Sequence, residues 1–365
     1  MDFSEYTGPS KEWLVLEPAL PTRTPGLTTE ELKAITNKGR EDVAARDMME
    51  QDLSSRVIIH DHRIPTRDNQ TLEARSYRPS NTNNTNPSKP LPVYIHLHGG
   101  GFLFGTLASE DAICSRIVTS LAEQENTPIV VLNVNYRHTP EHAYPVAWND
   151  TEDAFHWVHD HLGEIGGDGE RVVMGGISAG AWLAASTALA QNLARDGELA
   201  ARPRIRGMVL MIPGLVHYKC YRAQVERLRD PGVSSWVENR DAPVIPLKTV
   251  EMFMGLLGVE GGEGLEGDLR LNPGNARGEQ VAGLGPVTVG VAGMDPLRDE
   301  GLLFAQLLSE NGVPTRTNVF RGVPHGFRRF GEKLSVCEKW DAVMVEGIKW
   351  ALRDAVPGPF EIHAF

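Results

Sequence analysis

The chain has 365 residues, of which 41% are hydrophobic, and its formal net charge at pH 7 is −12. A chain of this length and composition can bury a large core, and one large domain with insertions fits better than two independent domains. The acidic balance argues against nucleic acid or an anionic membrane as the main partner. The cysteines lack paired metal-ligand spacing, so we expect reduced core residues at Cys114, Cys220 and Cys337.

The first residues have neither the basic nor the apolar region of a secretory signal. No stretch approaches the roughly 18 consecutive apolar residues that a membrane-spanning helix needs. We therefore expect a cytoplasmic protein with no membrane span. The sequence does not decide the oligomeric state, and a homodimer is compatible with it.

Residues 1–55 are expected to be helical or irregular, with a charged helix from Thr28 through Met49. A helical segment that precedes a sheet cannot form a core by itself, so it must pack over another part of the fold. We interpret it as an N-terminal cap segment, and a lid over a pocket is one candidate role. Two predicted strands follow, Val57–Asp61 and Leu72–Tyr77, separated by a turn-rich link.

From Leu91 onward, predicted strands and helices alternate. This alternation indicates an α/β fold, in which a mostly parallel sheet is covered by helices on both faces. The two earlier strands indicate an antiparallel edge. The predicted strands are Val93–Leu97, Ile129–Val134, Arg171–Met174, Met208–Ile212, Val287–Val291 and Thr315–Phe320. The predicted helices are Ser109–Ala122, Asn149–Leu162, Ala179–Leu193, one that starts at Asp299, and Ser335–Leu352.

The alternation breaks between Pro213 and Pro286, where apolar residues are followed by a stretch rich in glycine and glutamate. Loops of this length inside a compact domain are usually functional or disordered. We interpret residues 215–275 as a cap insertion. Residues 56–214 and 276–365 then form the main domain.

A G-x-S-x-G pattern lies between a predicted strand and a predicted helix, with Ser178 at its centre. In so sharp a turn the serine adopts a strained backbone conformation, at a cost of about 1–3 kcal/mol, and its hydroxyl stands at the helix N-terminus. The turn leaves room for almost no side chain two residues before and two residues after the serine. Gly176 and Gly180 occupy these two positions. Ser178 is therefore the candidate nucleophile.

A nucleophilic serine needs a base to take its proton and a third group to orient that base. The expected chain order is serine, acid, histidine, each after a strand. Asp295 follows the strand Val287–Val291, and His325 follows the strand Thr315–Phe320. We predict His325 as the base and Asp295 as the acid. Asp299 follows the same strand as Asp295, and we expect it to cap the helix that it opens.

The stretch 98–102 reads His-Gly-Gly-Gly-Phe and directly follows a predicted strand. It matches the H-G-G-G element of lipases and esterases. Glycines let backbone amides approach a developing negative charge without a Cβ in the way. The predicted oxyanion-hole donors are the amides of Gly100, Gly101 and Ala179, with Gly99 as a substitute.

With these motifs the chain resembles the hormone-sensitive-lipase-like group of α/β-hydrolases, which includes plant carboxylesterases. The resemblance runs from about residue 91 to residue 331. It implies a capped α/β-hydrolase fold with an eight-stranded, mostly parallel sheet, and ester hydrolysis through an acyl-enzyme without a cofactor. Besides the serine motif, it is carried by His98–Phe102, Tyr136–His142, Asp295–Gly301 and His325–Phe327.

The chain departs from this family around the serine. The family usually has Asp before the serine and Gly-Asn after Ser-Ala-Gly, where this chain has Ile177, Ala181 and Trp182. The lost acid removes a polar anchor, and the indole is expected to reshape the pocket, which affects acyl-chain preference more than catalysis. Phe102, Trp182 and Phe327 are candidate substrate-binding residues, and each is equally compatible with a place in the core.

Histidines elsewhere in the chain do not make a convincing metal site. His156, His159 and His161 lie on one predicted helix, and His60 and His62 lie at a strand end. A surface helix face and a strand end are the favoured interpretations. We therefore predict no metal.

The sequence predicts a serine carboxylic-ester hydrolase for small to medium esters, acting in a biosynthetic or detoxifying pathway. A non-hydrolytic enzyme on the same scaffold, such as an acyltransferase, cyclase or lyase, remains open because sequence cannot separate it from a hydrolase. A ligand-binding receptor is less favoured. Plant hormone receptors that resemble this family lack an element of the triad, whereas this chain keeps Ser178, Asp295 and His325.

Overall fold

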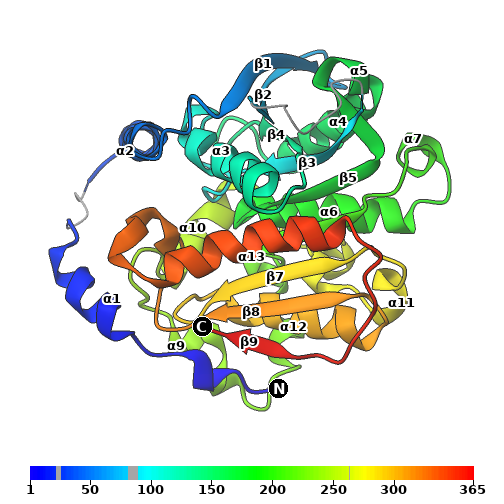
Figure 1. Ribbon diagram of the computed structural model, residues 1–365. Coiled ribbons are helices and arrows are strands. Elements are labelled where there is room, and N and C mark those ends of the chain that lie inside the picture. The colour runs from blue at the N-terminus through cyan, green and yellow to red at the C-terminus, as the bar shows by residue number, and fades with distance from the viewer. Residues whose placement is uncertain (22–25, 81–88, 263) are drawn as a thin grey trace.

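In the computed structural model, which describes residues 1–21, 26–80, 89–262 and 264–365, the chain forms one sheet with helices on both faces (Figure 1). The strand order is β1-β2-β4-β3-β5-β6-β7-β8-β9. β2 pairs antiparallel with β1 and with β4, and all other neighbouring strands run parallel. The predicted fold, a mostly parallel sheet with an antiparallel edge, is therefore confirmed. The strands are β1 (Val57–Pro65), β2 (Thr71–Pro79), β3 (Leu91–Leu97), β4 (Val130–Asn135), β5 (Gly167–Ile177), β6 (Gly207–Met211), β7 (Val287–Ala292), β8 (Thr315–Phe320) and β9 (Ile362–Ala364).

The sheet of the described residues has nine strands, one more than the resemblance implied. The additional strand, β9, pairs in parallel with β8. The ring of Phe365 stacks on Phe320, with 5.5 Å between the ring centroids. A strand of three residues is too short to show an alternation of apolar and polar residues, so the sequence pattern did not predict β9.

Helices cover both faces of the central strands, which are buried along their whole length in β3, β6 and β7. Side chains from α4, α6 and α12 form the core on one face, and side chains from α3 and α13 form the core on the other. Burial on both faces explains why these strands are continuous apolar runs. The helices are α1 (Lys11–Leu16), α2 (Thr29–Glu50), α3 (Asp111–Thr119), α4 (Val146–Asp160), α5 (Leu162–Ile165), α6 (Ala179–Leu193), α7 (Gly197–Ala201), α8 (Arg222–Val225), α9 (Ser235–Glu238), α10 (Leu247–Leu256), α11 (Gly278–Val281), α12 (Arg298–Glu310) and α13 (Val336–Ala351).

The predicted bounds hold for α6 and β8, whereas α3 is shorter than predicted. The sequence indicated a helix over 109–122, but its first residues form a 3₁₀ turn and its last ones a π-helical turn. Hydrophobic periodicity is nearly the same in the three helix types over so short a stretch, so it does not mark these transitions.

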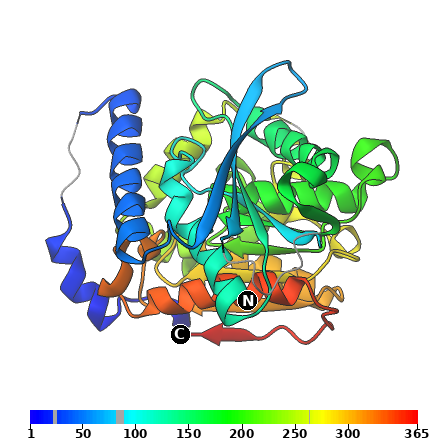
Figure 2. The same ribbon diagram turned by 45° about the horizontal axis from the view of Figure 1, so that its top comes forward.

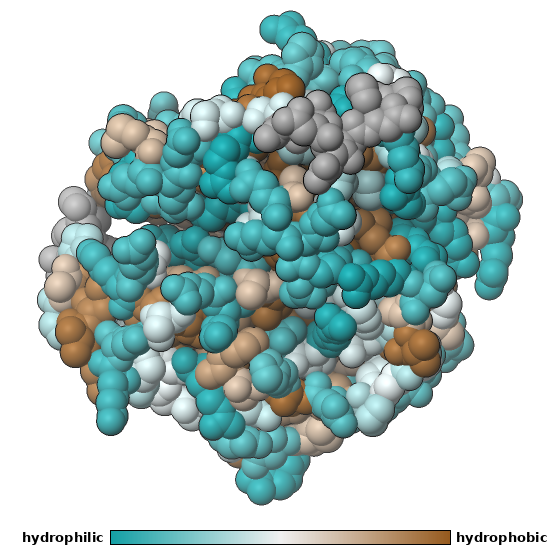
Figure 3. All heavy atoms as spheres, viewed as in Figure 1, coloured by the Kyte–Doolittle hydropathy of each residue, from teal (hydrophilic) through white to brown (hydrophobic). Residues whose placement is uncertain are grey.

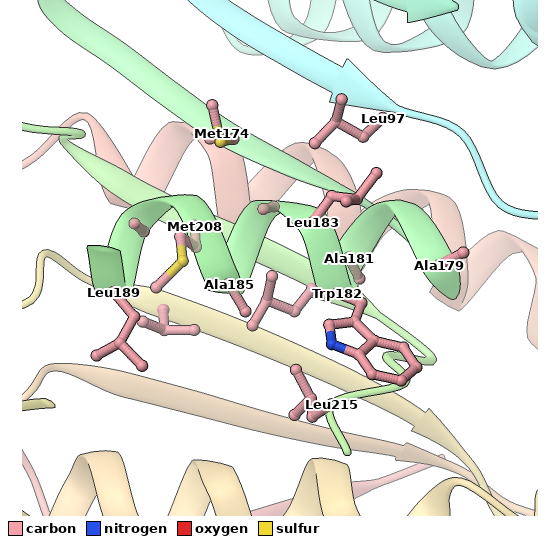
Figure 4. Packing of buried hydrophobic residues seen from close by; sticks show 14 of the residues in the cluster. Leu97, Met174, Ala179, Ala181, Trp182, Leu183, Ala185, Leu189, Met208 and Leu215 are labelled. Carbon is pink, nitrogen blue, oxygen red and sulfur yellow. The ribbon is translucent and has the colours of Figure 1, made fainter. Parts of the chain in front are cut away.

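Helix α6 packs against the sheet through alanine and leucine side chains, as Figure 4 shows. Small side chains let the helix approach the strands closely. The indole of Trp182 points toward Leu215, where the insertion begins (Figure 4). The nucleophile-bearing helix is therefore held by the sheet on one side and by the insertion on the other.

The two segments predicted to form a cap pack against the rest of the chain. Helix α2 runs along the side of the molecule next to α3 (Figure 2). The insertion 215–275 contains the short helices α8 and α9 and the longer α10, whose Val250 and Phe253 are buried. The division into a main domain and two cap segments stays a prediction, since the chain folds around shared cores.

On the face seen in Figure 3, hydrophilic residues predominate, and hydrophobic residues form small scattered groups. Among the described residues, no helix combines the length and the apolar character needed to cross a membrane.

A buried carboxyl group, Glu300, lies in the first turn of α12 and is completely shielded from solvent. One of its oxygens accepts a hydrogen bond from the Leu215 amide. The other has no partner among the described residues. Burial, assisted by the negative charge of Asp295, raises the pKa of Glu300 well above its usual value, against the opposing effect of the Leu215 amide. Burial therefore favours the neutral acid.

The raised pKa of Glu300 makes folding depend on pH. The stability that its protonation provides is fully present below the unfolded-state pKa of about 4.3, and it is lost as the pH rises through the raised folded-state pKa. Glu300→Gln keeps an acceptor for Leu215 but does not titrate. We expect the melting temperature of Glu300→Gln, measured relative to the unsubstituted protein, to increase as the pH rises above about 5. The control is Glu310→Gln, at the exposed end of the same helix. A difference that is the same for both variants at every pH would contradict the prediction.

Candidate active site

The turn from β5 into α6 places Ser178 in an unusual backbone conformation, with φ 55° and ψ −115°. Its amide donates to the Met211 carbonyl at 2.8 Å. A Cβ on Gly176 would lie 2.2 Å from the Leu97 carbonyl oxygen, and a Cβ on Gly180 would lie 2.0 Å from the same oxygen. Neither position can carry a side chain, so the turn fits only with glycine on both sides of the serine.

Ser178 forms a chain of hydrogen bonds with two buried side chains. Its Oγ lies 2.9 Å from Nε2 of His325, and Nδ1 of His325 lies 2.6 Å from Oδ2 of Asp295. Because the carboxylate only accepts, Nδ1 carries a proton in this arrangement, and Nε2 is left to accept the serine proton. The side chains predicted as nucleophile, base and acid therefore meet in the order that acyl transfer requires.

The loop of Asp295 is held by a residue that the sequence analysis missed. The side-chain amide of Asn239 donates to the carbonyl of Asp295 at 3.1 Å and to that of Gly293 at 3.3 Å. The second carboxylate oxygen of Asp295 accepts from the Leu297 amide at 2.9 Å. Asn239 lies in the insertion, so the insertion helps to hold the loop that orients His325.

The expectation that Asp299 caps its own helix is wrong. The N-cap residue of α12, Leu297, makes no side-chain cap, and the amide of Asp299 donates to the hydroxyl of Ser235 at 3.3 Å. Instead, Asp299 accepts at 2.7 Å from the amide of Ser235, the first residue of α9, and pairs at 2.8 Å with the buried Arg298. The carboxylate therefore satisfies a free amide of a different helix and neutralises a buried cation.

The glycine loop after β3 turns back on itself beside the serine. Gly100 and Gly101 have positive φ angles of 142° and 61°. A Cβ on Gly100 would lie 2.1 Å from the Phe104 carbonyl oxygen, and a Cβ on Gly101 would lie 2.3 Å from the ring of Phe253. Within the described ranges, the amides of Gly100, Gly101 and Ala179 donate to no other protein group. Unused amides are what an oxyanion site needs.

The three candidate substrate-binding aromatics do not lie together. Phe102 and Trp182 meet edge to face at 5.7 Å, and both are buried. The indole of Trp182 donates to the Leu271 carbonyl at 2.8 Å, so this departure from the family pattern ties α6 to the insertion. Phe327 lies elsewhere, in the core under α13, where it packs against Phe320 and Trp340.

The helix histidines do not converge on a metal site. His159 and His161 each direct Nδ1 to the backbone carbonyl four residues earlier, and His156 contacts Arg202. Of the described residues, only the cluster of His60, His62 and Glu164 groups metal-ligand atoms, all within 4.8 Å of one another. In that cluster both ring nitrogens of His62 already have partners, Glu164 and Ser76, each at 2.8 Å.

The chain is similar to known proteins in its family, in its sequence and in its fold. The model of a family described by the alpha/beta hydrolase fold matches residues 94–329. The chain is 30% identical over 291 residues to the ethyl acetate hydrolase of Pseudomonas putida, covering 80% of this chain and 82% of that one. It is 33% identical over 241 residues to the esterase LipI of Mycobacterium tuberculosis, covering 65% of each chain.

Among solved structures, the chain is similar to vibralactone cyclase, with a TM-score of 0.80, 25% identity, and coverage of 95% of this chain and 96% of that one. The family model spans the glycine loop, the serine turn and the loops of Asp295 and His325, and it matches more than half of the chain. The chain therefore belongs to the α/β-hydrolase family.

Proposed function

We propose that this chain is a serine carboxylesterase that hydrolyses small to medium esters through an acyl-enzyme. The observation that carries the proposal is the line of hydrogen bonds from Ser178 through His325 to Asp295. His325 removes the serine proton as the hydroxyl attacks the ester carbonyl, and it then delivers that proton to the leaving alcohol. Water attacks the acyl-enzyme in the second half of the reaction, with His325 acting again as the base.

The amides of Gly100, Gly101 and Ala179 are the proposed donors to the negative oxygen of the tetrahedral intermediate. Their positions on one glycine loop and at one helix N-terminus support this role, because both keep donors fixed before the charge develops. No step requires a metal or an organic cofactor. Asp295 keeps the imidazole in the tautomer in which Nε2 can accept a proton.

The names of the curated relatives, an ethyl acetate hydrolase and an esterase, support a small-molecule ester as the substrate. The similarity to a cyclase supports cyclisation as a second candidate reaction, in which an alcohol group of the acyl chain itself attacks the acyl-enzyme in place of water. We propose hydrolysis in the cytoplasm as the main activity. A homodimer stays an expectation from the sequence.

The nucleophile is tested by Ser178→Ala. This variant should stay folded and lose about 10⁴-fold or more in kcat for a nitrophenyl ester, because only this hydroxyl forms the acyl-enzyme. A serine-directed phosphonate should label the unsubstituted protein once, at Ser178, as read by intact mass and peptide mapping. Ser309→Ala is the matched control. The hydroxyl of Ser309 donates to the Gly358 carbonyl and makes no hydrogen bond with Ser178, His325 or Asp295. Stoichiometric labelling of Ser178→Ala would refute the assignment.

The choice of acid is tested by comparing two variants. Asp295→Asn should keep the fold and lose about 10⁴-fold in kcat, because it no longer holds the productive imidazole tautomer. Asp299→Asn should instead lower the free energy of unfolding by about 1.5–3 kcal/mol, because it removes one of the two carboxylates that pair with the buried Arg298 and leaves Glu238. Kinetics per active site and thermal melts separate the two effects. A stable but inactive Asp299→Asn beside an active Asp295→Asn would reverse the assignment.

The cap is tested at Phe253, whose ring lies against Gly101 in a small apolar cluster with Leu103 and Phe104. Phe253→Ala opens space over the glycine loop. We expect kcat/KM for a hexanoyl ester to rise about 10-fold relative to kcat/KM for an acetyl ester. This is about the gain that one additional methylene gives when it is bound in an apolar pocket. Met252→Ala is the control, because Met252 is 40% exposed on the same helix. If Phe253→Ala lowers only the melting temperature and leaves the ranking of acyl chains unchanged, Phe253 is a core residue without a role in selection.

A further inference from the structure

The cap helix α2 reaches the glycine loop through a row of polar side chains. Asn37 accepts from the Gly105 amide at 2.9 Å, and Glu41 accepts from the Thr106 hydroxyl at 2.7 Å. Between them in the sequence, Arg40 contacts the loop itself: its Nη1 donates to the Gly99 carbonyl at 2.9 Å. The contacted carbonyl belongs to the peptide unit that joins Gly99 to Gly100.

The geometry of a peptide unit links this contact to the amide of Gly100. The peptide bond between Gly99 and Gly100 is trans, so its C=O and N–H groups lie in one plane and point in opposite directions. A donor that fixes the Gly99 carbonyl therefore fixes the direction of the Gly100 N–H. The carbonyl of Gly100 is held by the amides of Leu103 and Phe104, which donate to it. Its N–H is not restricted in this way, since Gly100 has no side chain and a φ of 142° that other residues rarely adopt.

The Gly99 carbonyl accepts from a second donor as well. Nδ1 of His98 lies 3.1 Å from it, and burial lowers the pKa of His98 to about 4. The imidazole is therefore neutral at pH 7, and because a carbonyl only accepts, its proton lies on Nδ1. Nε2 then accepts from His138 at 3.4 Å. With both donors in place, both lone pairs of the Gly99 oxygen are used.

Arg40 is itself held by a buried carboxylate. Its Nη2 donates at 2.8 Å to Glu110, whose side chain is 2% exposed, and the other oxygen of Glu110 lies 3.0 Å from Nε2 of His96. Burial alone would raise the pKa of Glu110, but the hydrogen bond with His96 and the charge of Arg40 lower it to about 2. The guanidinium thus spans two fixed groups, one arm on Glu110 and one on Gly99, as its planar fork allows.

We propose that Arg40 is a positioning residue, which aims the Gly100 amide at the oxyanion by holding the Gly99 carbonyl. The proposal rests on the proposed function, since it assigns a task within the same acyl transfer. Arg40 touches neither the serine nor the ester. Its effect passes through one peptide plane, and polarisation of that peptide by a charged donor also makes the Gly100 N–H a better donor.

The test is Arg40→Lys, which keeps a positive charge beside Glu110 but offers a single ammonium in place of a fork. The ammonium is expected to stay with the charged Glu110, which leaves the Gly99 carbonyl with His98 alone as its donor. Active sites are counted by end-point titration with a phosphonate, so that kcat is expressed per competent Ser178. We expect kcat per site to fall about 10- to 100-fold with KM unchanged, because the oxyanion contact exists only in the transition state and loss of one whole donor costs about 10²–10³-fold.

The Ki of a trifluoromethyl ketone provides a second measurement, which separates a loss of the oxyanion contact from a general loss of stability. The ketone forms a hemiketal oxyanion on the serine, so its Ki should rise by the same factor by which kcat/KM falls. Lys33→Met is the matched control on the same helix, since Lys33 anchors α2 to Thr139 and Glu141 but makes no contact with Gly99. Its kcat per site should match that of the unsubstituted protein.

If Arg40→Lys does not fold, the pair Arg40→Met with Glu110→Gln removes the charges of both partners together and is measured in the same way. A kcat per site within about twofold of the unsubstituted protein would overturn the proposal, as would fewer titratable sites with normal turnover at each. If the unsubstituted protein shows no hydrolysis that depends on Ser178, the proposed function fails instead. The two failures are therefore distinguishable.

Discussion

The turn that carries Ser178 leaves no space for a side chain two residues before or after it, and the rest of the site is arranged around that constraint. Gly176 and Gly180 both face the Leu97 carbonyl at the end of β3, at distances that exclude a Cβ. The end of β3 must therefore touch the start of α6. Because the glycine loop directly continues β3, close packing at this one point also fixes how far the loop lies from the serine.

The strands on the other side of the turn complete the arrangement. β6 supports Ser178 through the Met211 carbonyl, and the loops after β7 and β8 carry Asp295 and His325. Parallel strands end at the same edge of a sheet, so side chains far apart in the sequence are delivered to one place. The strained serine conformation persists because this packing holds it from several directions.

Local sequence signals were sufficient to predict much of the fold and of the candidate site. The α/β-hydrolase fold and ester hydrolysis were predicted from short motifs and from the alternation of strands and helices, and both predictions are confirmed. Ser178, Asp295 and His325 were chosen from their place after strands, and the structure brings them within hydrogen-bonding distance, although their catalytic roles stay predictions. The misses at the site share one cause, which is pairing between residues distant in sequence.

Asp299 binds the Ser235 amide, 64 residues away, and Arg40 binds Gly99, 59 residues away. No periodicity or motif records such pairs, because a side chain's distant partner depends on how whole elements pack. Trp182 is a related case. It was a candidate for the pocket and equally for the core because it follows the serine closely, and its buried indole donates to the Leu271 carbonyl in the insertion.

The contacts between the cap segments and the glycine loop bear on how an enzyme of this design can evolve. The outward residues Ile35, Met49 and Met252 are 59%, 75% and 40% exposed, so they can vary at little cost. The inward residues of the same helices, Arg40 and Phe253, instead rest against the backbone that is proposed to stabilise the reaction. A change there that admits a new ester also disturbs that backbone. The proposed roles of Phe253 and Arg40 make substrate range and turnover coupled traits, so we expect new specificities to arise through paired, compensating substitutions rather than single ones.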